Sequence, residues 1–158
     1  MNGKMDAAGA GSDQRYRDLF DCIADPLFVY DRETLAYLDV NDAAIEQYGY
    51  SREDFLGMTI KDIRPVEDIP ALLETLSRSG AGQEARGLWR HQKRDGSIMV
   101  VEVFARGLDV DGRAACLIHA CDVTRRVEAE RVTAGALMDL HRSQRLERIA
   151  STVGRLGG

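Results

Sequence analysis

The sequence predicts an α+β fold, in which a five-stranded antiparallel sheet carries helices on one face. Three observations lead to this prediction. Two short apolar runs lie before residue 41, three longer strand-like runs lie between residues 86 and 121, and helical spacing fills the rest. Because the strands cluster at both ends of a helical segment, we expect the sheet to be antiparallel. A helix is expected to flank it at the N-terminus and a long coiled-coil helix at the C-terminus.

The start of the chain predicts a tail, a helix and a hairpin. Residues 1–12 are small and lack apolar periodicity, so we expect a disordered tail. The segment DQRYRDLFDCIAD, with Ser12 or Asp13 as its cap, has apolar residues three to four apart and predicts a short helix that Pro26 ends. PLFVYD and AYLDV, joined by the turn DRET, are typical of two hairpin strands.

Three helices are predicted between the two groups of strands. Asn41 or Asp42 is placed to cap NDAAIEQYGY, which stops at Gly49. Ser51 and Asp54 have the spacing of a capping box at the start of SREDFLG. VEDIPALLETLSRSG has the periodicity of a further helix.

The second half changes from strand to helical periodicity. RGLWRHQK, SIMVVEVFA and RAACLIHAC are separated by RDGS and DVDG, which are hairpin-turn sequences. From Thr124 the pattern is helical nearly to the end. We therefore divide the chain into a tail of residues 1–12, a sheet domain of residues 13–123 and a helix of residues 124–158.

The composition excludes several classes of function. The chain has 158 residues, enough for one domain with an extension, and a net charge of −5 without a basic run interleaved with aromatics, which argues against nucleic-acid binding. No apolar run approaches the roughly 18 residues of a membrane span, and no signal-peptide core is present at the N-terminus. Three cysteines without an apparent pairing fit a reducing compartment, so we expect a cytoplasmic chain without membrane insertion.

The order of elements, with KRDGS between two strands and CDVTRRVEAE after the last, resembles the PAS domain family over about residues 14–130. NDAAIEQYGYSREDFLG is similar to a segment of that family, and Asp122-Val123-Thr124 is similar to the D-x-T junction that ends many PAS cores. The resemblance implies a PAS fold and a relay role for Asp122 and Thr124. On physical grounds, the Thr124 hydroxyl is placed to cap the long helix, worth about 1 kcal/mol, and Asp122 to pair with a cation. The alternative is a stable helix start and nothing more.

The alternation of side chains along the strands predicts which residues face the helices. Their mostly apolar character, with a few polar tips, fits either a small-molecule site or a filled core. His91 is the best single contact, because the resemblance to flavin-binding relatives places it where they use an asparagine for the ring. The predicted pocket residues are Phe28, Tyr30, Tyr48, Ile60, Trp89, His91, Val101, Val103, Ile118 and Ala120.

The resemblance also implies three tests for bound cofactors. Haem-binding relatives use a histidine on the helix that corresponds to VEDIPALLETLSRSG, which contains none. Relatives that form a cysteinyl-flavin carry a cysteine where this chain has Ile60, and relatives with a thioester chromophore need a cysteine between Cys22 and Cys116, where none lies. We therefore expect no haem, cysteinyl-flavin or thioester chromophore, and an unknown small ligand stays open.

The stretch CLIHACDVT places Cys116, His119 and Cys121 within six residues. On a strand only His119 and Cys121 share a face, which is too few for a zinc site of four ligands. A reactive Cys121 thiol just before a helix, or a redox or metal enzyme using Cys121 and His119, are the alternatives. We expect buried strand cysteines, no metal site and no catalytic residue.

The C-terminal helix carries two apolar stripes with the spacing of a parallel dimeric coiled coil. The stripes are out of heptad phase, so a break or phase slip is expected near residues 141–145. The alternative is that this helix folds back on its own sheet. The predicted dimer seam consists of Val127, Ala134, Leu137, Leu140, Leu146, Ile149, Val153 and Leu156.

The final stretch, LHRSQRLERIASTVGRLGG, resembles the start of the dimerisation helix of histidine kinases. This resemblance implies a homodimeric sensory module of a two-component histidine kinase, which detects a small ligand or a partner and acts on downstream kinase dimerisation and catalytic domains in a phosphorelay. The alternatives are a PAS dimerisation or docking scaffold without a sensory role, and a PAS module of a cyclase or transcription regulator.

Overall fold

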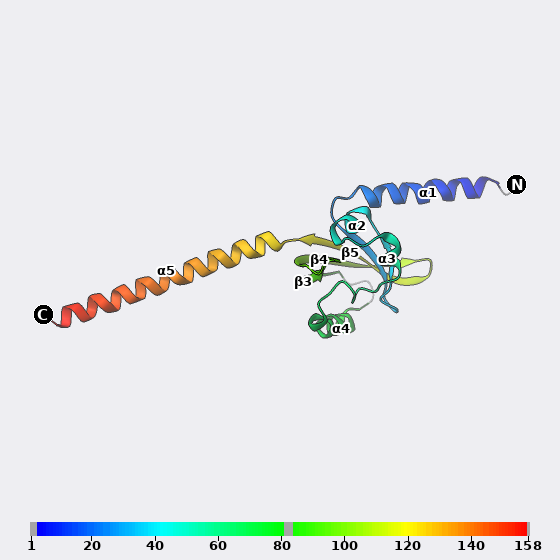
Figure 1. The fold of residues 1–158 in the computed structure, drawn as a ribbon. Helices are drawn as coiled ribbons and strands as arrows, with labels where there is room; N and C mark the ends of the chain where they lie inside the picture. Colours follow the sequence, from blue (N-terminus) through cyan, green and yellow to red (C-terminus); the bar gives the residue numbers. More distant parts are fainter. Residues whose placement is uncertain (1–2, 81–83, 158) are drawn as a thin grey trace. The chain divides into compact units, whose positions relative to one another are not determined.

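The computed structural model describes residues 3–80 and 84–157, and the predicted α+β architecture is confirmed (Figure 1). Five strands form one antiparallel sheet in the order β2-β1-β5-β4-β3. Residues up to Asp122 form one compact unit, and residues from Val123 form another. In chain order the elements are α1 (Gly3–Cys22), β1 (Leu27–Asp31), β2 (Tyr37–Val40), α2 (Asp42–Tyr48), α3 (Arg52–Leu56), η1 (Val66–Asp68), α4 (Ile69–Arg78), β3 (Ala85–Gln92), β4 (Ile98–Val110), β5 (Arg113–Asp122) and α5 (Thr124–Leu156).

The sheet places its first and last strands side by side. Strand β1 pairs with β5 from Leu27 opposite His119 to Asp31 opposite Ala115, and β2 extends the sheet on the other side of β1. Strands β4 and β5 are joined by the predicted DVDG turn. Asp111 and Gly112 have φ values of 50° and 80°, the left-handed conformations that a two-residue hairpin turn of this kind requires.

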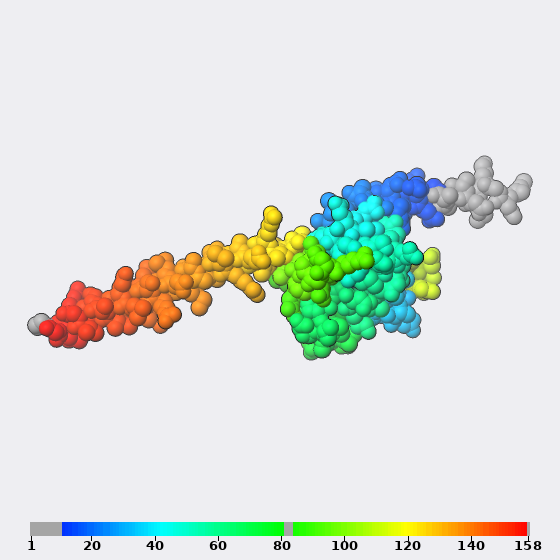
Figure 2. Space-filling model, viewed as in Figure 1, coloured from blue at the N-terminus to red at the C-terminus, as the bar shows by residue number. Residues whose placement is uncertain are grey.

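Alternation along the strands separates two apolar clusters. Phe28 and Tyr30 of β1 belong to the main core, which packs against α2, α3 and α4. Leu27 and Val29 point to the opposite face, where Phe20 of α1 packs on them. Figure 2 shows the side of this unit that the segment from α2 to β3 covers, in cyan and green. Helix α4, the irregular segment before η1 and the sheet face opposite them line the candidate site.

The predicted helix caps of the middle segment are confirmed. The Asn41 side chain accepts a hydrogen bond from the Ala44 amide, and Gly49 ends α2 in the left-handed conformation with φ of 83°. Ser51 and Asp54 form a reciprocal capping box at the start of α3. Each of these side chains or conformations satisfies a backbone group that a helix end leaves without an intrahelical partner.

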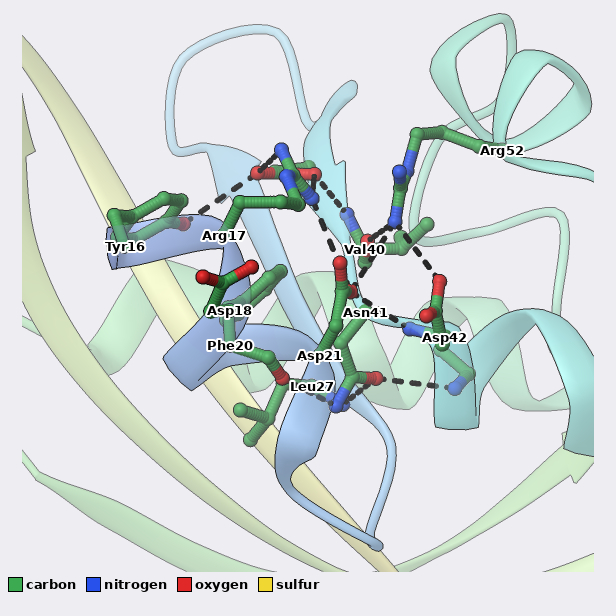
Figure 3. Close-up of polar contacts among 12 residues, drawn as sticks. Tyr16, Arg17, Asp18, Phe20, Asp21, Leu27, Val40, Asn41, Asp42 and Arg52 are labelled. Atoms are coloured by element: carbon green, nitrogen blue, oxygen red, sulfur yellow. Dashed lines mark hydrogen bonds and ion pairs between the residues drawn. The ribbon is translucent and has the colours of Figure 1, made fainter. Parts of the chain in front are cut away.

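A polar network holds the end of α1 to the sheet unit (Figure 3). Arg17 donates to both carboxylate oxygens of Asp39 on β2, at 3.1 and 2.8 Å, and Arg52 of α3 lies 3.3 Å from the Asp21 carboxylate. Asn41 is completely buried, and its side-chain amide donates to the backbone carbonyls of Phe20, Ile23 and Asp25, which lie at the end of α1 and in the loop after it. One amide side chain therefore joins α1, β1 and α2.

The prediction for the N-terminus is wrong in one respect. Helix α1 begins at Gly3, so residues 3–12 are helical and not a disordered tail, and neither Ser12 nor Asp13 is its cap. The alanines of this segment favour a helix, and an existing helix extends without a new nucleation step. Residues 1 and 2 of the predicted tail lie outside the described residues.

Candidate ligand-binding cavity

A cavity of about 290 Å³ lies between the sheet and the segment that runs from α3 to α4. Its volume is at the lower end of the range of roughly 300–1,000 Å³ typical of small-molecule sites. Of the ten predicted pocket residues, seven line it: Phe28, Tyr30, Ile60, Trp89, His91, Val103 and Ile118. The other three, Tyr48, Val101 and Ala120, are buried in the adjoining core and are not among the residues that line the cavity.

The strands supply the cavity wall through alternate residues. On β3, Ala85, Gly87, Trp89 and His91 all line the cavity, as the strand period of two requires. Gly87 leaves room beside the indole, because a Cβ atom built there would lie 3.4 Å from Trp89 Nε1. Any larger side chain at this position would reduce the cavity.

His91 is 1% exposed and connects the cavity to helix α2. Its Nδ1 atom lies 2.6 Å from the Tyr48 hydroxyl, whereas Nε2 is buried and has no hydrogen-bond partner. Burial, and after it the positive charge of Arg64, hold the pKa of His91 well below its usual range. The imidazole is therefore neutral at physiological pH, and its Nε2 atom is available for a hydrogen bond to a ligand.

Arg64 is the functional residue that sequence reasoning missed. It lies in the irregular segment before η1, is 9% exposed, and lines the cavity. Its guanidinium carbon lies 4.6 Å from the centre of the Trp89 ring, a cation–π arrangement, while Nε and Nη1 are buried without a hydrogen-bond partner. Burial lowers the pKa of Arg64, and the nearby Tyr37, Tyr48 and Tyr30 oppose that shift. The group nevertheless stays charged at physiological pH, because arginine loses its proton only far above neutrality.

Two further polar groups of the wall, the Tyr30 hydroxyl and the Cys116 thiol, are neutral. Burial raises the pKa of the Tyr30 hydroxyl, which lies beside the Cys116 thiol, and burial likewise raises the pKa of that thiol. Both groups are protonated at neutral pH. Cys116 is buried, as predicted, and its environment does not favour the thiolate that a nucleophile needs.

The CLIHACDVT stretch shows no metal-binding arrangement. His119 Nε2 lies 2.8 Å from an Asp25 carboxylate oxygen, on the face of β5 opposite to Cys116. Within residues 3–80 and 84–157, no group of three or more His, Cys, Asp or Glu side chains is arranged to hold a metal ion. Metal chemistry at this strand therefore has no geometric support in the part of the chain that the structure describes.

The structure of the junction between β5 and α5 differs from the prediction in the role of Thr124. The residue that precedes α5 in the cap position is Val123, whose side chain makes no capping bond, and Thr124 is the first helical residue. The prediction that Thr124 caps the helix is wrong, because β5 continues to Asp122 and leaves only one residue for the change of backbone conformation. Asp122 accepts a hydrogen bond of 3.4 Å from Gln47 of α2.

Helix α5 carries the predicted seam residues on one continuous helix from Thr124 to Leu156. No break occurs at residues 141–145, so of the two predicted alternatives the phase slip within a regular helix stays a prediction. Leu137, Leu146 and Ile149 are all more than half exposed. These side chains form an exposed apolar surface on the helix. No helix among the described residues is long and apolar enough to cross a membrane.

Comparison with known proteins agrees with the fold of the sheet unit. A family model described as PAS fold matches residues 20–128. The methyl sulfide methyltransferase-associated sensor of Methanosarcina acetivorans is 30% identical over 121 residues, which cover 75% of this chain but 12% of that protein.

Two solved structures are similar throughout the sheet unit. A domain of the sensory box sensor histidine kinase/response regulator from Geobacter sulfurreducens is 32% identical with a TM-score of 0.59, over 70% of this chain and 94% of that one. The PAS domain of an HTR-like protein from Haloarcula marismortui is 23% identical with a TM-score of 0.67, over 75% of this chain and 98% of that one.

Proposed function

We propose a sensory function for this chain, which belongs to the PAS domain family. In this proposal the cavity binds a small molecule, and its occupancy changes the pairing of two copies of α5. The intact protein is then a two-component histidine kinase whose output domains follow α5. The sensor and the sensor histidine kinase among the similar proteins support this assignment.

The observation that carries the proposal is the buried, unpartnered Nε2 atom of His91 at the cavity wall. A filled core has no reason to keep such a group, since a buried polar atom without a partner costs about 1–3 kcal/mol. A ligand that bonds to His91 removes that cost and so favours the occupied state.

A chain of contacts supports a route from the cavity to the end of β5. His91 contacts Tyr48 at the end of α2, and the preceding residue, Gln47, donates to Asp122, the last residue of β5. A ligand that shifts His91 thereby shifts α2 against the strand end from which α5 continues. A shift of this kind needs a ligand that binds the two arrangements with different affinity.

The pairing of α5 is tested by sedimentation velocity on the whole chain. We expect a dimer, and we expect Leu137→Asp to weaken it at least about tenfold, because a carboxylate in an apolar seam loses its hydration. Val132→Asp is the matched control, since Val132 is exposed on the same helix but lies outside both stripes. A monomeric wild type, or equal effects of the two variants, would contradict the paired-helix output.

The relay is tested by filling the cavity. Gly87→Leu places a side chain against Trp89, and Gly87→Ala serves as the smaller control. We expect the leucine variant to change hydrogen exchange in the first turns of α5 and the alanine variant to change it less. Unchanged exchange in a folded leucine variant would refute the relay.

The cofactor expectation becomes part of this proposal: the ligand is neither haem, nor a cysteinyl-flavin, nor a thioester chromophore. The purified chain should therefore lack the absorption bands of haem and of a thioester chromophore, and illumination should form no cysteinyl-flavin adduct. A docking scaffold without a ligand is the second candidate. It predicts that native mass spectrometry finds no small molecule and that no compound perturbs the fluorescence of Trp89, the single tryptophan of the chain.

A further inference from the structure

Among the described residues, the cavity wall carries arginines and no carboxylate. Arg32, Arg64, Arg86 and His91 line it, and no Asp or Glu is among the lining residues. This imbalance is contrary to the composition, because acidic residues outnumber Lys and Arg by 26 to 21 in the whole chain. The excess of arginine in the wall therefore does not follow from the overall composition.

Two of the three arginines are engaged elsewhere. Arg32 donates to the backbone carbonyls of Ser79 and Gly80 at 3.0 and 3.2 Å. Arg86 donates twice to Glu102, at 2.8 and 2.6 Å. Neither guanidinium is free to serve as the main contact of a ligand.

Arg64 has no ion pair among the described residues. Its only ring contact is with Trp89, and two of its three nitrogens are buried without a hydrogen-bond partner. Buried arginines in proteins are nearly always paired, because an uncompensated buried charge is strongly destabilising. A partner that arrives from outside the chain would account for this arrangement.

His91 adds a second donor aimed at the cavity. If the Tyr48 hydroxyl donates to Nδ1, the tyrosine proton is satisfied and Nε2–H alone lacks a partner. The other tautomer leaves both the tyrosine proton and the Nε2 lone pair unsatisfied within the buried site. The first arrangement leaves fewer unpaired groups, so Nε2 is a hydrogen-bond donor.

We propose that the cavity binds a small organic monoanion, a carboxylate whose head group lies between Arg64 and His91 and whose apolar body contacts Ile60, Ile63 and Leu72. This inference rests on the proposed sensory function and specifies the ligand class. Among the arginines of the wall, Arg64 has the buried nitrogens without a hydrogen-bond partner, so we match this one group to a single negative charge. The planar guanidinium can bond both oxygens of a carboxylate, and the unpartnered atoms of Arg64 and His91 provide donors for one such head group.

The test uses two pairs of probes that differ in charge and hardly in shape: benzoate against benzamide, and hexanoate against hexanamide. Binding to the whole chain is followed by Trp89 fluorescence and by the shift of the melting temperature. We expect at least one carboxylate to bind about 30-fold or more tightly than its amide, because the amide leaves the buried charge unpaired. We expect Arg64→Gln to remove this preference, and Arg78→Gln, which removes an exposed charge on α4, to keep it.

Two controls separate a loss of binding from a loss of folding: the conservative variant Arg64→Lys, and circular dichroism of each variant. The lysine keeps the charge but loses the two-pronged contact, so carboxylate binding should be weaker than in wild type and still stronger than in Arg64→Gln. Equal affinity for acid and amide, or unchanged binding in a folded Arg64→Gln, would overturn the monoanion proposal while the sensory function stands. Absence of binding by every probe, together with no molecule found by native mass spectrometry, would overturn both. A neutral or cationic molecule that copurifies with the chain would overturn the monoanion proposal alone.

Discussion

Replacing Asn41 with alanine should destabilise the sheet unit far more than the loss of one helix cap. The Asn41 Oδ1 atom accepts from the amides of Leu27 and Ala44 at 2.9 and 3.1 Å, and its Nδ2 atom donates to the carbonyl of Phe20 (Figure 3). The Nδ2 atom also donates to the carbonyls of Ile23 and Asp25. Alanine removes all of these bonds from a position with no solvent exposure.

The magnitude follows from what each lost bond leaves behind. Loss of the cap at Ala44 costs about 1 kcal/mol. The buried Leu27 amide without a partner costs roughly 1–3 kcal/mol, and the carbonyl contacts, which share only two amide hydrogens, add about 1 kcal/mol. We therefore expect a loss of about 3–5 kcal/mol, a large part of the roughly 5–15 kcal/mol that stabilises a typical domain.

The assay is urea unfolding followed by Trp89 fluorescence, with Asn41→Ser as the discriminating variant. Serine is as good a cap as asparagine but cannot reach both β1 and the end of α1, so it should recover only about 1 kcal/mol. Asp42→Ala, whose side chain is 68% exposed, is the control and should change stability by less than about 1 kcal/mol. Wild-type stability in Asn41→Ser would refute the bridging role and leave Asn41 as a cap alone.

Three further expectations concern the cavity and the thiols. Because the folded pKa of His91 is lowered, the unfolded state alone binds a proton below about pH 6.5, so stability should fall as pH decreases, by up to about 1.4 kcal/mol per pH unit. His91→Gln should flatten this part of the pH profile measured by urea unfolding. Arg64→Met should raise the stability of the ligand-free chain by about 1–2 kcal/mol, since relief of two unpaired buried nitrogens outweighs the lost contact with Trp89. A thiol reagent should label exposed Cys22 at least about 100-fold faster than buried Cys116, because Cys116 reacts only after the core opens.

Each of these expectations has a contradicting result. A His91→Gln variant with an unchanged pH profile would mean that the imidazole is protonated in the folded state. Destabilisation by Arg64→Met would mean that the guanidinium has partners that satisfy it. Equal labelling rates of Cys22 and Cys116 in folded protein would mean that β5 is accessible to solvent.

The regular parts of this chain could be predicted because their signals are local or periodic. The alternation that placed Phe28, Tyr30, His91 and Ile118 on one face depends only on the strand period of two. The caps at Asn41 and Ser51, and the DVDG turn, follow from side chains that bond to their own nearby backbone.

The prediction errors lie in segments whose sequence has no helical or strand periodicity, and at an element boundary that pairing with a neighbouring strand determines. Arg64 lies between two short helices, in a segment without periodicity, and an arginine is expected at the surface. The signals available were the apolar Ile60 and Ile63 before it and the rigid Pro65 after it, which together restrict where its side chain can go. The capping role assigned to Thr124 failed because the length of β5, set by its pairing with β4, moved the cap to Val123.

The position of β1 between β2 and β5 has a consequence for synthesis of the chain on the ribosome. While the nascent chain emerges, β1 has only β2 beside it, and an isolated two-stranded hairpin is marginally stable at best. The second neighbour of β1 is β5, which begins at Arg113 and is the last strand of the sheet to be synthesised. Strand β5 also brings Cys116 and Ile118 to the cavity. The compartment therefore closes in a single late event, and a small molecule present in the surrounding solution at that moment can be enclosed as the sheet is completed.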